Sequence, residues 1–169
     1  MTTLTPIPAP IASLPPEPTP SLVYVHPGRL AVSAGPDSFA TVVGSGVAVS
    51  VWDPVRRVGG MAHFLLPEAG TAPPAPRYGD VALRSLLDQL AALGGRSFRA
   101  AVHGGSAPPI ASESGHLGDR NVAAALSFLT LRGIMVVVRD VGGTGARKVV
   151  FHPVHGAVEV ARVAVELTR

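Results

Sequence analysis

The stretch that decides the fold runs from residue 41 to residue 66 and reads TVVGSGVAVSVWDPVRRVGGMAHFLL. It predicts three successive strands, at 41–43, 47–52 and 60–66, because β-branched and apolar residues dominate each of them. A Gly-Ser-Gly turn at 44–46 separates the first two strands, and a polar bend separates the second from the third. The last run is almost continuously apolar, which is typical of a strand buried on both faces.

Two helices follow. Asp80 is a candidate N-cap for a helix over Val81 to Leu93, which Gly94 and Gly95 end. One face of this helix is formed by Leu83, Leu86, Leu87 and Leu90. A second helix is predicted to begin near Asp119 or Arg120 and to end before Gly133, with Val122, Ala125, Leu126 and Leu129 on one face.

Shorter apolar segments complete the pattern. They predict further strands at 22–25, 30–32, 134–138, 148–151 and 157–165, with loops at 68–76 and 140–146. Strands that outnumber two helices indicate an α/β fold of the α+β sandwich type, with a mixed sheet of six or more strands packed against the helices. Residues 1–21 are rich in proline and predict a disordered tail, which leaves one domain over residues 22–169.

Composition narrows the function classes. The chain has no cysteine, which excludes thiol catalysis, disulfides and thiolate metal sites. A net charge of +3, spread over the chain, gives no reason to expect nucleic-acid binding. Apolar runs are shorter than a membrane span and the N-terminal residues do not resemble a signal peptide, so we expect a cytoplasmic protein without membrane insertion. The histidines form no metal-binding motif, and we expect neither a metal nor a cofactor.

Several residues have chemistry that the sequence alone leaves open. His63 interrupts an apolar strand, so it is either a hydrogen-bonded core residue or a group that faces a cleft. Gly44 and Ser45 lie in a turn whose backbone N–H groups suit an oxyanion or a substrate, and equally suit an ordinary turn. Ser45 is not within a GxSxG motif, and the glycines at 142–145 lack the spacing of a phosphate-binding loop.

Together these landmarks resemble the conserved blocks of the CheD family, in the family's order, from about Leu22 to the end of the chain. The blocks are Val25-His26-Pro27-Gly28, residues 41–49, residues 59–67, Arg77-Tyr78-Gly79-Asp80, His103-Gly104-Gly105, Leu117-Gly118-Asp119-Arg120-Asn121, Asp140-Val141-Gly142-Gly143 and Ala146-Arg147-Lys148. The resemblance implies an α/β sandwich that hydrolyses glutamine side chains of methyl-accepting chemotaxis receptors to glutamate and releases ammonia.

The family's catalytic residues carry over by motif position. In the family a cysteine attacks the amide carbon, a histidine activates it, and a threonine orients the site. His63 matches the histidine and Thr41 the threonine, but Gly46 occupies the cysteine position. The resemblance therefore implies a deamidase that is weak or inactive, since a missing nucleophile removes most of the rate enhancement. Ser45 is adjacent to Gly46, but neighbouring residues of an extended segment point to opposite faces.

Two other function classes stay open. One is a non-catalytic adaptor that binds receptors or a CheC-type phosphatase, which family members also bind. Residues 106–110 depart from the family's usual sequence, so this segment is where partner binding can differ from that of other family members. The other is a hydrolase that uses Ser45 or a water molecule activated by His63, and it requires these two side chains within hydrogen-bonding distance.

Overall fold

The computed structural model describes residues 17–107 and 115–163, and these contain nine strands and two helices. The strands are β1 Leu22–Tyr24, β2 Arg29–Ser33, β3 Ser38–Val43, β4 Val47–Asp53, β5 Val58–Phe64, β6 Arg99–Gly104, β7 Met135–Val141, β8 Arg147–His152 and β9 Ala157–Arg162. The helices are α1 Gly79–Ala92 and α2 Gly115–Leu131. Each predicted strand has a counterpart, and the α+β class is confirmed. The run predicted at 60–66 ends at Phe64, the one at 134–138 extends to Val141 into the expected loop, and residues 164–165 of the last run lie outside the described residues. Residues 1–16 of the Pro-rich tail lie outside the described residues.

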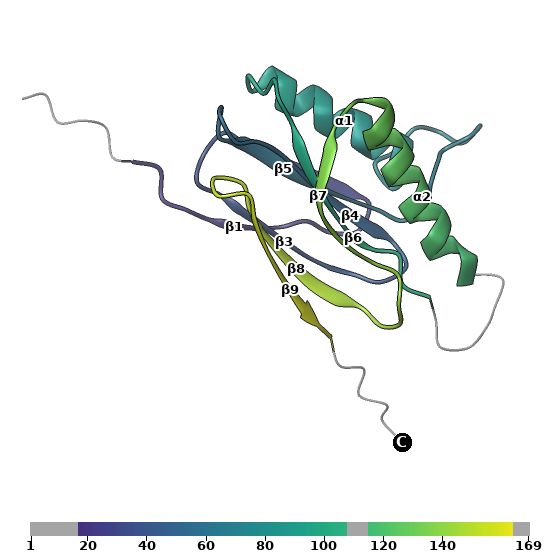
Figure 1. Cartoon of the computed structure of the whole chain (residues 1–169). Coiled ribbons are helices and arrows are strands. Elements are labelled where there is room, and N and C mark those ends of the chain that lie inside the picture. Colours follow the sequence, from purple (N-terminus) through teal and green to yellow (C-terminus); the bar gives the residue numbers. More distant parts are fainter. Residues whose placement is uncertain (1–16, 108–114, 164–169) are drawn as a thin grey trace, which may run out of the picture.

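The strands divide between two mixed sheets, so that the domain has three layers (Figure 1). Both helices cover one face of the five-stranded sheet, whose strand order is β2-β5-β4-β6-β7. The four-stranded sheet, with order β1-β3-β8-β9, packs on the opposite face. Strands β4 and β5 are therefore enclosed by helices on one side and by a second sheet on the other, which explains why all their residues are buried.

Two apolar cores fill the spaces between the layers. The core between the helices and the five-stranded sheet includes the predicted leucine face of α1 and residues Ala125 and Leu129 of α2. The core between the two sheets is formed around Phe39, Trp52, Met61 and Phe151. Successive residues of β4 and β5 contribute alternately to these two cores, as the two-residue period of a strand requires.

Both predicted helix starts were wrong by a few residues. Helix α1 begins at Gly79 with Tyr78 as its N-cap, so Asp80 lies inside the first turn. The Asp80 carboxylate instead accepts a hydrogen bond from the Ala69 backbone N–H at 3.1 Å, because the loop before the helix folds back over its start. Helix α2 begins at Gly115, four residues before Asp119. The predicted stop at Gly133 is confirmed, since this residue follows the helix with a φ of 66°.

Asp53 fixes the turn between β4 and β5. One carboxylate oxygen accepts the backbone N–H groups of Val55 and Arg56, and the other accepts those of Arg96 and Ser97. Burial alone raises the pKa of Asp53, but these four donors outweigh it and hold the pKa well below 3.8. The β4–β5 hairpin is thereby joined to the segment that leads into β6.

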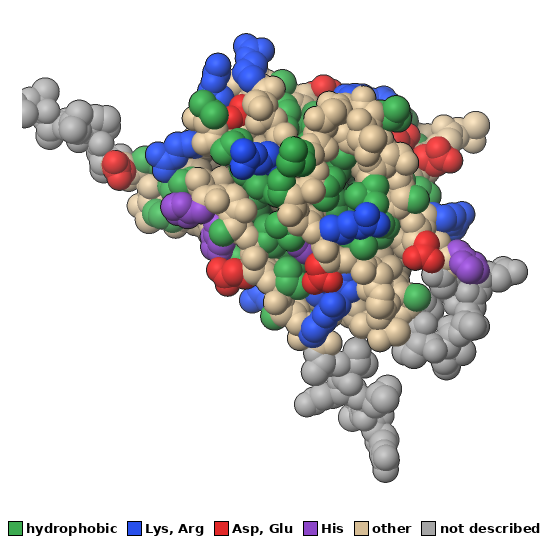
Figure 2. Space-filling model, viewed as in Figure 1, with side chains coloured by type: hydrophobic (Ala, Val, Ile, Leu, Met, Phe, Trp, Pro, Cys, Tyr) green, Lys and Arg blue, Asp and Glu red, His purple; other side chains and the backbone are tan. Residues whose placement is uncertain are grey.

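The surface carries charges of both signs. Figure 2 shows Lys and Arg side chains interspersed with Asp and Glu around the visible face. Apolar side chains lie over its middle, near the edge strand β7, where Met135 and Val137 are exposed. Neither described helix is long and apolar enough to cross a membrane. The described residues also contain no group of three or more metal-binding side chains.

Candidate functional site

Three strand ends bring Thr41, Gly46 and His63 together. Strands β4 and β5 are antiparallel, with Ala48 opposite His63, so Gly46 lies just beyond the end of β4 and close to the imidazole. Thr41 comes from β3 in the other sheet and points into the space between the sheets, toward His63. Residues that are separated by up to 22 positions in the sequence thus converge on one buried point.

The hydrogen bonds of Thr41 define the tautomer of His63. The Thr41 hydroxyl donates its only proton to the Val25 carbonyl oxygen at 2.7 Å, and it lies 2.9 Å from His63 Nδ1. The hydroxyl oxygen must therefore accept a hydrogen bond from Nδ1–H, which leaves a lone pair on Nε2. Burial lowers the pKa of His63 from 6.5 to about 4, so the ring is neutral at pH 7. A neutral imidazole with a bare Nε2 is the form that accepts a proton.

The unprotonated nitrogen faces Gly46. A Cβ atom built on Gly46 lies 3.1 Å from His63 Nε2, so a side chain at this position begins next to the imidazole. Gly46 is not among the described glycines with positive φ, so its backbone conformation is not one that only glycine favours. The same Cβ lies 2.7 Å from the Phe64 carbonyl oxygen, which is closer than Cβ atoms lie to backbone oxygens in proteins, so any side chain at position 46 requires the backbone here to shift.

Each carbonyl group of the Gly44-Ser45-Gly46 turn has a fixed partner. The Gly44 oxygen accepts the Ser106 N–H at 3.0 Å, and the Gly46 oxygen accepts the Gly105 N–H at 2.7 Å. The Ser45 oxygen accepts Nδ2 of Asn121 at 3.0 Å. Among the described residues, the backbone N–H groups of Gly44 and Ser45 have no hydrogen-bond acceptor, so the expected role of these groups as oxyanion donors stays a prediction.

The structure does not bring Ser45 into contact with His63. Ser45 is exposed, and within the described part of the chain no hydrogen bond joins its hydroxyl to the imidazole. The serine-hydrolase alternative required such a bond, so this geometry gives it no support.

Sequence reasoning assigned no role to Asn121 at the site. Its side chain is fully buried, and Nδ2 donates to the carbonyl oxygens of Ser45 and of Leu65, at 3.0 and 2.9 Å. The signal in the sequence was a polar residue on the apolar face of α2, since Asn121 is one helical turn before Ala125. A polar residue in such a position needs buried partners, but their identity depends on the tertiary fold.

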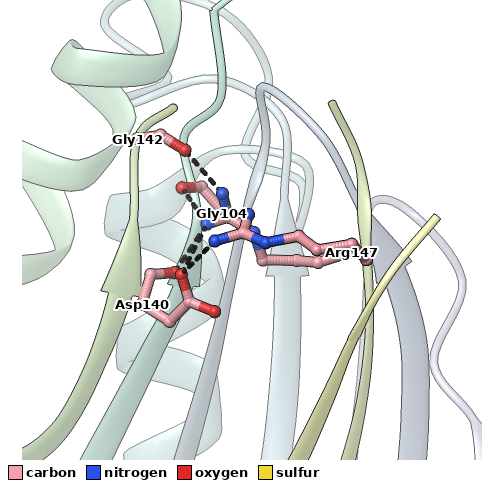
Figure 3. A network of polar contacts seen from close by, with 5 residues as sticks. Gly104, Asp140, Gly142 and Arg147 are labelled. Atoms are coloured by element: carbon pink, nitrogen blue, oxygen red, sulfur yellow. Dashed lines mark hydrogen bonds and ion pairs between the residues drawn. The ribbon is translucent and has the colours of Figure 1, made fainter. Parts of the chain in front are cut away.

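Arg147 was also not predicted to be buried. Its guanidinium donates to the backbone oxygens of Gly104, Asp140 and Gly142 and faces the Asp140 carboxylate at 3.6 Å (Figure 3). The glycine-rich turn at 142–145 is therefore attached to an arginine of its own chain through the carbonyl group of its first residue, Gly142. This network fixes Gly104, which directly precedes the residue that holds the Gly46 carbonyl group.

His103 is a second buried imidazole. It lies on β6 opposite Ala48, which separates it from His63 on β5. Neither ring nitrogen has a hydrogen-bond partner within the described residues. Burial lowers the pKa of His103 to about 4; the nearby Asp140 opposes this shift and Arg147 adds to it. His103 is therefore neutral at pH 7 as well.

Comparison with known proteins identifies the class. Residues 65–162 match the family model described as CheD chemotactic sensory transduction. This match covers more than half of the chain, and the chain belongs to the CheD family.

Individual relatives extend the similarity over most of the chain. A protein of Anaeromyxobacter dehalogenans (strain 2CP-C) named probable chemoreceptor glutamine deamidase CheD 1 is 44% identical over 144 residues, which cover 83% of this chain and 84% of the relative. A probable chemoreceptor glutamine deamidase CheD of Vibrio vulnificus (strain YJ016) is 34% identical over 153 residues, or 84% of this chain and 72% of the relative. A relative of the same name from Bordetella petrii is 39% identical, with 84% of this chain and 66% of the relative covered.

Proposed function

We propose that this chain carries the glutamine-deamidase site of the CheD family without its nucleophile, and that it hydrolyses chemoreceptor glutamines weakly or not at all. The observation that supports this most directly is the geometry around Gly46. The Cβ position at this residue lies 3.1 Å from an imidazole nitrogen whose tautomer leaves it ready to accept a proton. The names of the relatives supply the reaction and the substrate class.

The reaction requires a group that attacks the glutamine carboxamide carbon. A thiol at position 46 would transfer its proton to His63 Nε2, and its sulfur would form a bond to the carboxamide carbon. The imidazolium would then return the proton to the departing nitrogen, so that the carbon–nitrogen bond breaks and ammonia leaves. Water would hydrolyse the resulting thioester to glutamate. Gly46 provides no atom for the first step, while His63 would carry the proton and Thr41 would hold its ring through Nδ1.

The direct test is to restore the nucleophile. A cytoplasmic chemoreceptor fragment is incubated with the unmodified chain, with Gly46→Cys, and with Gly46→Cys combined with His63→Ala, and deamidation is measured by mass spectrometry. Ser45→Cys is the matched control, because it adds a thiol one residue away on an exposed side chain. We expect deamidation by the Gly46→Cys variant and by none of the other three proteins.

Each other result would contradict a specific part of the proposal. Deamidation by the unmodified chain would show that water or another group replaces the thiol. Equal activity of Gly46→Cys and Ser45→Cys would show that the position next to Nε2 has no special role. A Gly46→Cys protein that folds and binds the fragment but does not deamidate it would show that the pocket is no longer a deamidase site.

A second candidate is a non-catalytic adaptor that binds receptors or a CheC-type phosphatase. The observation in its favour is that Leu65 and Leu66 are both more than a third exposed, and that Leu65 lies against the Cβ position of Gly46. An apolar rim at the site favours protein binding. Binding of the unmodified chain to the receptor fragment, lost in Leu65→Asp with Leu66→Asp, would support this candidate, whereas unchanged binding in that double variant would contradict it.

A further inference from the structure

The Gly44-Ser45-Gly46 turn is attached to its surroundings in two different ways. The carbonyl groups of Gly44 and Gly46 are held by backbone N–H groups of the segment that follows β6. The middle carbonyl group, that of Ser45, is held by the side chain of Asn121. A substitution at position 121 can therefore release this one attachment while the backbone attachments stay in place.

The same amide group also reaches the strand that carries the histidine. The paired residues of β4 and β5 end at Val47 and Phe64, and beyond this point the two chains diverge. Asn121 Nδ2 lies between them, 3.0 Å from the Ser45 oxygen and 2.9 Å from the Leu65 oxygen. Because one nitrogen donates both of its hydrogens, it sets the separation between the residue before Gly46 and the segment after His63.

The packing of helix α2 leaves Asn121 little freedom to move. One turn earlier, a Cβ atom on Gly118 would lie 2.5 Å from the Gly105 oxygen and 2.8 Å from the Ser106 oxygen, so the helix packs directly on this backbone. Asn121 itself is fully buried, and its Oδ1 atom has no partner within the described part of the chain. An amide flip would bring Oδ1 toward two carbonyl oxygens, so the donor contacts fix the orientation even though the acceptor is unsatisfied.

We propose that Asn121 is a positioning residue of the candidate site, which sets the distance between position 46 and His63 Nε2 by bridging the Ser45 and Leu65 carbonyl groups. It touches neither reacting atom. This inference rests on the proposed function, since it concerns the same pair of positions.

The test measures the reactivity of a thiol at position 46. In the Gly46→Cys chain, the neutral His63 accepts the thiol proton at Nε2 as the sulfur attacks, so iodoacetamide alkylation at pH 7 should be about tenfold faster than in Gly46→Cys with His63→Ala. Adding Asn121→Ala to Gly46→Cys should abolish most of this difference. Asn121→Asp keeps the side-chain volume but turns an oxygen toward the two carbonyl groups, and it should have the same effect if the alanine variant fails to fold.

Leu129→Ala is the matched control, because Leu129 is a buried core residue of the same helix, two turns from Asn121. It destabilises α2 without removing a contact to the site, and the alkylation rate of Gly46→Cys should stay within about twofold. Fast, His63-dependent alkylation that survives both Asn121 variants would overturn the inference and leave the proposed function intact. Alkylation of Gly46→Cys that does not depend on His63 would instead overturn the proposed function, and the inference with it.

Discussion

Lowering the pH from 7 to 4.5 should destabilise the folded chain, because His63 and His103 are both fully buried and neutral. The pKa of each imidazole is about 4 in the folded state, against an ordinary value of 6.5. Between these two values the unfolded chain binds more protons than the folded chain. The free energy of unfolding is therefore at its full value above about pH 6.5 and falls as the pH decreases toward 4.

The size of the effect follows from the difference in pKa. A pKa decrease from 6.5 to about 4 means that each histidine lowers the free energy of unfolding by about 3 kcal/mol once the pH is below the folded-state pKa. Near pH 5 both histidines are protonated in the unfolded chain and neutral in the folded chain. The free energy of unfolding should therefore change by about 1.4 kcal/mol per pH unit for each histidine, and by about 2.7 kcal/mol per pH unit for the pair. The carboxyl groups of Asp37 and Asp53 have pKa values lowered from 3.8, so their contribution is lost only at lower pH.

The assay is urea denaturation at intervals of half a pH unit from pH 7 to 4.5, for the unmodified chain, His103→Leu and Leu129→Ala. His103→Leu should reduce the slope near pH 5 by about half. It should also raise the stability at pH 7 by about 1 kcal/mol or more, since it removes a buried polar ring without partners. Leu129→Ala should lower stability by about 2–5 kcal/mol at each pH and leave the slope unchanged.

A total loss of less than about 1 kcal/mol between pH 7 and 4.5 would refute this reasoning, because even one buried histidine should contribute more. An unchanged slope in His103→Leu would show that the proton uptake belongs to other groups.

Two further predictions concern buried charges. Arg147→Met should lower the free energy of unfolding by about 3 kcal/mol, because three backbone oxygens lose a charged donor. Arg147→Lys should recover little of this stability, because an ammonium group lacks the planar arrangement of donors. Urea denaturation of both variants measures the two differences. Stability of Arg147→Lys equal to the unmodified chain would contradict it. Asp53→Asn should cost about 2 kcal/mol at pH 7, because an NH2 group then faces backbone N–H donors. The difference should shrink below pH 3.8, because the carboxyl group of the unfolded chain then takes up a proton while the native carboxylate, whose pKa is lower, does not. A difference that stays constant down to pH 2.5 would count against the assigned role of the carboxylate.

Much of the fold could be predicted from local pattern. The apolar run at 60–66 predicted a strand buried on both faces, and this is confirmed for β5, Val58–Phe64, whereas Leu65 and Leu66 lie beyond the strand and are exposed. The division into two sheets could not be predicted, because β3 pairs with β8 about 100 residues later, and nothing local in either segment specifies that partner. The helix starts were misjudged for a similar reason, since Asp80 is a good N-cap by type but its carboxylate is engaged by the preceding loop.

The site was predictable where a residue type is unusual in its context. His63 interrupts an apolar strand, and Gly46 stands out only through the order of the family's motifs. Asn121 and Arg147 were not assigned to the site because a buried polar side chain reveals its role through its partners, which here are backbone carbonyl groups of distant segments.

The Asp53 turn has a consequence at the opposite end of the hairpin. Side chains alternate between the two faces of a strand, so a shift of β5 by one residue relative to β4 would move His63 from the space between the sheets to the helix side. Thr41 could then no longer reach it. A carboxylate about 17 Å away, five residue pairs along the hairpin, thus helps to decide into which layer of the protein the imidazole points.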